Sequence, residues 1–139
     1  MKTTYLSSAM GTGLVYVEYA ITYADLTTAG TAQNITLFTP SQPKFKIMGV
    51  TIKHSTAFAG TGPWTTCTVS VGTAVAPTAY ASAFDIFQAV GDFQDSAQYK
   101  STTEAATAVI ARFTASHNVN VGTAGSVYIR VLYLDITTP

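Results

Sequence analysis

The stretch LVYVEYAITYA, residues 14–24, decides the fold class of this chain. Its odd positions all carry β-branched or aromatic residues: Val15, Val17, Tyr19, Ile21 and Tyr23. A period of two places such a set on one face of an extended strand. The even positions, which include Glu18, are only partly polar. The stretch therefore predicts a β-strand with one face in the core and a second face that is not fully solvated.

Five further segments alternate in a similar way, and turn-forming residues separate them. The predicted strands are residues 33–39, 45–54, 65–72, 105–115 and 126–136. Segments with Gly or Pro lie between them, at residues 28–30, 40–43, 60–63, 77 and 122–125. This pattern is typical of an all-β fold, a single-domain antiparallel β-sandwich or jelly roll. Residues 79–90 are the exception, because helical spacing of Ala83, Phe84, Phe87 and Val90 predicts one short helix there.

The composition indicates a building block of an assembly. Charged residues make up 10% of the 139 residues and hydrophobic residues 47%, and seven Lys and Arg balance seven Asp and Glu. A free soluble domain normally carries charge on about 25–35% of its surface positions. The last predicted strand is apolar on both faces, with Val127, Ile129, Val131 and Tyr133 on one and Tyr128, Leu132, Leu134 and Ile136 on the other. One face can fill the core of the chain itself, so we expect another layer to cover the second.

The length predicts one domain with one core, formed by residues 14–139. Residues 1–13 contain little core-forming material, so they are predicted to be a flexible N-terminal arm that becomes ordered on a neighbouring subunit. Tyr5, Leu6 and Met10 are its large apolar anchors. The first residues lack a continuous apolar segment, so we expect neither a signal peptide nor a membrane span, and a cytosol-like site of synthesis.

Residues with catalytic potential are few. Cys67, His54 and Asp85 are the residue types of a nucleophile, a base and an anchoring acid, but nothing in their spacing requires such a site. Cys67 falls on the inward face of a predicted strand, where it is expected to be a small buried hydrophobe. His54 is expected to be a solvated or interface residue at the end of its strand, and His117 a turn residue. We therefore expect no enzymatic activity and no catalytic residues.

Metal, cofactor and nucleic-acid sites are not indicated either. Asp92, Asp95 and Glu104 carry the oxygen ligands that Ca²⁺ prefers, but without an EF-hand pattern they predict a solvated loop. Residues 60–63 lack the Lys and the helix start of a nucleotide-binding loop. Basic residues are scattered and balanced by acids, so no phosphate-binding patch is predicted. We expect no metal, no cofactor, and neither nucleic acid nor a membrane as a partner.

The aromatic residues leave one binding mode open. Trp64 lies beside a loop, with Phe58 and Tyr80 near it in the sequence, and such rings can stack on a sugar. Packing in the core or in an interface is the alternative for the same residues. The candidate interaction residues of the chain are therefore Tyr5, Leu6, Met10, Phe58 and Trp64.

Four segments carry a resemblance to a known group of proteins. They are IKHSTAFAGTG at 52–62, VSVG at 69–72, AFDIFQAVGD at 83–92 and TAGSVYIRVLY at 123–133. Together they resemble small virion structural proteins of tailed bacteriophages, over residues 14–136. That group includes capsid decoration or cement proteins, head fibres and tail appendages. The resemblance implies a β-sandwich that works as a homotrimer, and it brings no catalytic residues with it.

Composition and resemblance together favour a capsid decoration protein that binds the outer shell of a virion and stabilises it. The expected location is the virion, after synthesis in the host cytoplasm. The expected partners are further copies of the chain and the major capsid protein or other virion proteins. The alternative is a tail or head-fibre component that binds host-surface glycans through loops such as residues 57–64. A cell-wall hydrolase is a weaker third possibility, because no paired carboxylates stand out.

Overall fold

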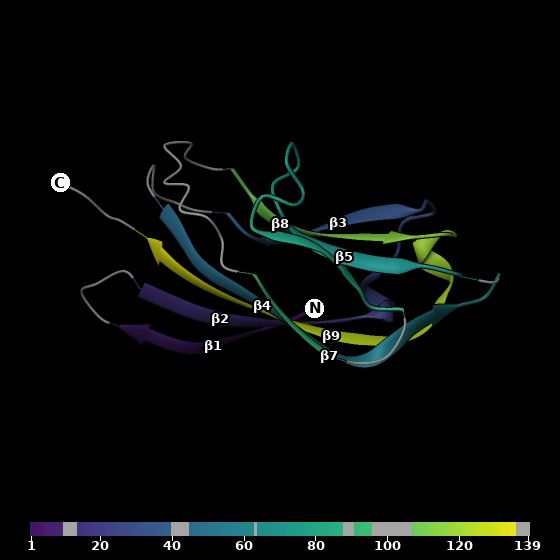
Figure 1. The fold of residues 1–139 in the computed structure, drawn as a ribbon, viewed down its shortest axis with the longest axis horizontal. Coiled ribbons are helices and arrows are strands. Elements are labelled where there is room, and N and C mark those ends of the chain that lie inside the picture. The colour runs from purple at the N-terminus through teal and green to yellow at the C-terminus, as the bar shows by residue number, and fades with distance from the viewer. Residues whose placement is uncertain (10–13, 40–44, 63, 88–90, 96–106, 136–139) are drawn as a thin grey trace.

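The computed structural model describes residues 1–9, 14–39, 45–62, 64–87, 91–95 and 107–135. In chain order its elements are β1 (Lys2–Ala9), β2 (Leu14–Thr22), the 3₁₀ helix η1 (Tyr23–Asp25), β3 (Ala32–Phe38), β4 (Phe45–Gly60), β5 (Cys67–Gly72), β6 (Ala81–Asp85), β7 (Gly91–Asp95), β8 (Val109–Ala115), the 3₁₀ helix η2 (Val119–Val121) and β9 (Gly122–Asp135). The strands form two antiparallel sheets, one with the order β1-β2-β9-β4-β7 and one with the order β3-β8-β5-β6. Figure 1 shows these sheets stacked as two layers, so the predicted all-β sandwich is confirmed.

The core lies between the two sheets and follows the alternation of the sequence. On β2, Val17, Tyr19 and Ile21 are buried, whereas the residues between them are half-buried on the other face. These three residues pair in register with fully buried residues of β9, namely Val131, Ile129 and Val127. The second sheet contributes the opposite wall, which includes Cys67, Val69, Val71, Val109, Ala111 and Phe113. Each buried aliphatic side chain of this kind contributes about 1.5–3 kcal/mol to folding.

Two glycines let the backbone approach buried aromatic rings at the irregular ends of β4 and β9. Gly125 has a φ of 139°, and a Cβ atom at this position would lie 2.3 Å from Cγ of Phe58. A Cβ atom on Gly60 would lie 2.3 Å from Cε2 of Trp64. Only glycine leaves room for these rings, so the two positions fix where Phe58 and Trp64 enter the core.

The predicted helix over residues 79–90 is wrong for the described part of that segment. Residues 81–85 form β6, which pairs with β5 through Thr68 with Asp85 and Val69 with Phe84. β5 pairs with β8 on one side. Pairing with β6 on the other side satisfies backbone N–H and C=O groups of β5 that would otherwise lie at a sheet edge. This tertiary pairing outweighs a weak local helical spacing. Residues 88–90 lie outside the described residues.

The predicted domain boundary also differs from the structure. Lys2–Ala9 form strand β1, which pairs along its length with β2, from Lys2 opposite Ala20 to Ala9 opposite Leu14. An edge strand needs ladder hydrogen bonds and β-forming residues rather than large core side chains, and the Thr and Ser residues of this segment meet that need. The described part of the predicted arm therefore belongs to the sandwich.

Candidate functional site

The candidate interaction residues fall into two groups. Tyr5 and Leu6 lie on β1 and are 67% and 41% exposed, so they remain available for contact. Phe58 is fully buried and Trp64 is 5% exposed. Proposing these two as surface interaction residues was wrong, and the alternative of core packing is confirmed. Phe58 lies on β4, which continues beyond its predicted end as far as Gly60, and the Trp64 ring packs on Gly60. Met10 lies outside the described residues.

The catalytic residue types are part of the core. Cys67 is fully buried, as expected, and burial, with a smaller contribution from Asp85, raises the pKa of its thiol to about 12. A thiol with this pKa stays protonated at neutral pH and is a poor nucleophile. The prediction of a solvated or interface His54 was wrong. His54 is 2% exposed on the inward face of the extended β4, with its ring centroid 6.3 Å from those of Phe58 and Phe84.

The remaining titratable candidates are dispersed. His117 is exposed at a bend after β8, as predicted for a turn residue. Asp92 and Asp95 lie in β7 rather than in a loop, because their segment pairs with β4, and Glu104 is not among the described residues. Within the described ranges no group of three or more His, Cys, Asp or Glu side chains could hold a metal ion. No helix found in those ranges is long and apolar enough to cross a membrane.

The strongest surface feature is the face of the five-stranded sheet that points away from the core, which we call the outer sheet face. Leu14 pairs with Leu134 and Tyr16 pairs with Leu132 across β2 and β9, and all four are only half-buried. Met48, at an irregularity of β4 beside them, is 36% exposed. In the part of the chain that the structure describes, no further layer lies on this face (Figure 1). The predicted two-sided apolar strand is thus present, and its second face is not covered by the described residues.

The two outward faces of the sandwich differ in polarity. On the four-stranded sheet, β3 and β8 present Asn34, Thr36 and Thr114 as exposed residues. On the outer sheet face the central charges pair with each other, since Arg130 Nε donates to Glu18 Oε2 over 2.7 Å. A partly exposed pair of this kind adds at most about 1 kcal/mol. Lys46, opposite Leu134, and Lys53, opposite Tyr128, also lie on this face. The outer sheet face is the more suitable of the two for apolar contact, because its leucines and Tyr16 are only half-buried.

The free edge of β1 is the second surface feature. Tyr5 pairs with the core residue Val17 but is itself exposed, because among the described residues β2 is the only strand beside β1. Leu6 is the extra residue of an irregularity between Tyr5 and Ser7. Burial, with smaller contributions from Tyr133 and Tyr5, raises the pKa of the neighbouring Tyr19, so Tyr19 stays neutral. Uncharged apolar and aromatic groups thus continue from the core to the sheet edge.

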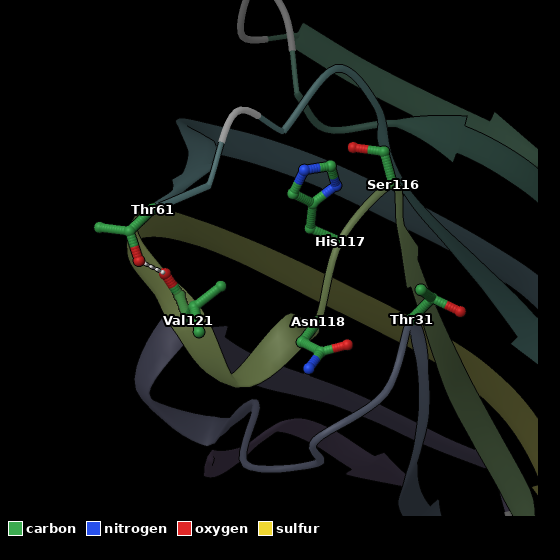
Figure 2. A pocket seen from close by; sticks show the side chains of 6 residues that line it. All are labelled: Thr31, Thr61, Ser116, His117, Asn118 and Val121. Atoms are coloured by element: carbon green, nitrogen blue, oxygen red, sulfur yellow. Dashed lines mark hydrogen bonds between the residues drawn. The ribbon is translucent and has the colours of Figure 1, made fainter.

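A shallow hollow at one end of the sandwich collects polar side chains from separate loops (Figure 2). It has a volume of about 370 Å³ and is lined by Thr31, Thr61, Ser116, His117, Asn118 and Val121. The Thr61 hydroxyl donates to the carbonyl of Val121, and the Ser116 hydroxyl accepts from the amide of Thr65 at 2.8 Å. The hydroxyl groups of Thr61 and Ser116 thus connect the loops to each other. Trp64 and Phe58 do not line the hollow.

Comparisons with known proteins give a shared fold. No family model matches the chain, and no curated protein matches it. A chain from the capsid asymmetric unit of cyanophage Pam1 is similar in structure, with a TM-score of 0.61 and 23% identity over 92% of this chain and 89% of that one. A chain from infectious bursal disease virus, Gx strain, matches with a TM-score of 0.28 and 16% identity over 88% of this chain and 37% of that one, which is too weak to support an argument. The first likeness shows that this sandwich fold occurs in a chain of a phage capsid.

Proposed function

We propose that this chain is a structural protein of a bacteriophage virion and that it decorates the capsid, binding the outer shell and stabilising it. The observation that carries the proposal is the fold shared with a chain of the cyanophage capsid asymmetric unit over almost the whole of both chains. The outer sheet face and the second edge of β1 support it, because nothing in the described part of the chain covers them and a protein neighbour would bury both.

Stabilisation follows from mass action without catalysis. A subunit that binds only the assembled shell adds the free energy of its own binding to the stability of that shell. The major capsid protein or another virion protein is the partner, and further copies of this chain associate with it as the homotrimer that the resemblance implies. Catalysis, cofactors, nucleic acid and membranes have no part in this role.

The test compares particles that contain the protein with particles that lack it. Both are heated, or exposed to a chelator, and retention of packaged DNA is measured. Particles with the protein are expected to retain DNA at temperatures several degrees higher, since each bound subunit favours the closed shell. Equal retention in both preparations would reject the decoration role.

Adding purified variants to particles that lack the protein shows which surface of the chain binds the shell. Leu132→Lys combined with Leu134→Lys places charge on the outer sheet face and is expected to abolish the protection. Asn34→Lys combined with Thr114→Lys places the same charge on exposed positions of the other sheet and is expected to preserve it. Glycan binding by the hollow that contains Thr61, together with unchanged DNA retention, would favour the tail or head-fibre alternative.

A further inference from the structure

Among the described residues, strand β1 has a neighbouring strand on one edge only, and its other edge is unprotected. Natural sheet edges are usually protected by charged side chains, by proline or by a covering segment, because an open row of backbone groups can pair with another strand. Lys2 is the one charged residue between Lys2 and Ala9, and this segment contains no proline. Three of the six large hydrophobic side chains that are exposed in the described ranges lie at or just before this strand: Met1, Tyr5 and Leu6.

From these features we infer that β1 of one copy pairs antiparallel with β1 of a second copy across a two-fold axis, which joins two five-stranded sheets into one. The inference concerns the isolated chain and does not depend on the virion role. The two-fold pair is an alternative to the homotrimer that the resemblance implies and to direct contact of Tyr5 and Leu6 with a shell. A two-fold contact is self-complementary by definition, so one strand must supply both sides of it. The residues of β1 meet that condition.

Full overlap of Lys2–Ala9 with its own copy places residue i opposite residue 11 − i. Tyr5 then lies opposite Leu6 of the second copy on both sides of the axis, so the two exposed hydrophobic residues of the strand meet each other. Thr3 and Thr4 lie opposite Ser8 and Ser7, a favourable type of cross-strand pair. The irregularity at Leu6 falls on the axis, where each copy contributes the same one.

Charge does not oppose this register. Lys2 lies opposite Ala9 of the second copy, so the two lysines stand about seven residues, or about 23 Å, apart along the pair. That separation exceeds the Debye length of about 8 Å at physiological ionic strength. Any register shifted far enough to bring the lysines together would also separate Tyr5 from Leu6, so full overlap is the favoured register.

Cysteine pairs test both the contact and its register. The chain has one cysteine, Cys67, which is fully buried and does not interfere. In the variant Thr4→Cys/Ser7→Cys, each new thiol lies opposite one of the second copy. Within one chain these positions are about 10 Å apart, too far for a disulfide. Mild oxidation is expected to convert most of this variant into a covalent dimer on a non-reducing gel.

The matched control is Thr4→Cys/Ser8→Cys, in which no new thiol faces another in the inferred register. It is expected to give less than about a tenth of the dimer formed by the first variant, since disulfide geometry is specific. Adding Tyr5→Lys and Leu6→Lys to the first variant is expected to abolish cross-linking, whereas adding Val75→Lys, at a 96% exposed loop position, leaves it unchanged.

Three results would overturn the inference: equal cross-linking of both cysteine pairs, no cross-linking of either, or cross-linking that survives the two lysines. Thermal unfolding of each variant identifies any that fails to fold. Sedimentation of the unmodified chain supplies an independent measurement, and a purely monomeric species at about 100 μM would exclude a stable β1 pair.

Discussion

Gly125 is the residue at which backbone conformation and core packing depend most directly on each other. Its φ of 139° is unfavourable for any residue with a Cβ atom, and the ring of Phe58 occupies the place that such an atom would take. Gly125→Ala is therefore expected to lower the free energy of unfolding by about 2–4 kcal/mol, since strain and overpacking add. Urea unfolding followed by Trp64 fluorescence measures this change.

The control for that substitution is Gly49→Ala. A Cβ atom on Gly49 would meet no heavy atom within 4 Å beyond its chain neighbours, and the φ of this residue is not positive. The same change of side chain is therefore expected to alter stability by less than about 0.5 kcal/mol. Equal losses in the two variants would contradict the packing of Phe58 on Gly125.

Cys67 gives the core a predictable dependence on pH. Its pKa is raised to about 12 by burial, whereas in the unfolded chain the thiol ionises near its ordinary value. Above that ordinary value the unfolded state binds fewer protons than the folded state, so stability falls as the pH rises toward 12. The slope from this one thiol reaches about 1.4 kcal/mol per pH unit.

Replacing the thiol isolates its contribution. The stability difference between the wild type and Cys67→Ala, measured by urea unfolding from pH 7 to pH 11, is expected to be constant at first and to shrink above about pH 9. Tyr19 and the other ionising groups remain in both proteins and cancel in the difference. A pH-independent difference would show that Cys67 is solvated in the folded state.

At the scale of elements, β1 is attached to the sandwich through β2 and contributes no buried side chain at positions 1–6. Deletion of residues 2–12 is therefore expected to leave the fold intact while costing about 1–3 kcal/mol for the lost ladder. The same deletion is expected to weaken particle binding, because it removes Tyr5 and Leu6. Circular dichroism and a particle sedimentation assay measure the two effects.

A second variant tests the two exposed side chains of β1 while keeping the strand itself. Tyr5→Ser combined with Leu6→Ser retains the β1 backbone, and it is expected to weaken binding without the loss of stability. Undiminished particle binding by both variants would remove β1 from the attachment surface.

The sequence predicted the strands whose alternation has large apolar side chains on one face. Residues 14–24 and 126–136 correspond to β2 and β9, because their inward faces fill the core. β1, β6 and β7 escaped prediction because their formation depends on a partner: β1 carries Thr and Ser, and β6 contains a helix-like spacing. A strand whose stability comes from its neighbour leaves little local signal.

At the scale of the whole molecule, the sequence predicted that an apolar assembly surface exists, but not which residues lie side by side on it. The two-sided apolar character of residues 126–136 predicted a second apolar face outside the core of the chain, and the sheet order placed Leu132 and Leu134 of that face beside Leu14 and Tyr16. Trp64 and Phe58 show the limit of the same reasoning. An aromatic residue near a loop has the same local sequence whether it faces solvent or the core. Here both rings face the core, because Gly60 leaves room for Trp64 and Gly125 leaves room for Phe58.

The neutrality of the whole chain leads to the last prediction, which concerns salt. Seven basic residues balance seven acidic ones in the whole chain, and Glu18 and Arg130 pair with each other on the outer sheet face. Electrostatic attraction to a shell is then small, so added salt has little to screen. Affinity for particles that lack the protein is expected to change by less than about threefold between 50 mM and 500 mM NaCl, since apolar contacts on Leu132 and Leu134 are not screened. Binding measured by co-sedimentation over this range checks the prediction. A steep loss of affinity would show instead that Lys2, Lys53 and their neighbours bind acidic groups of the shell, and that charge rather than buried apolar area holds the subunit in place.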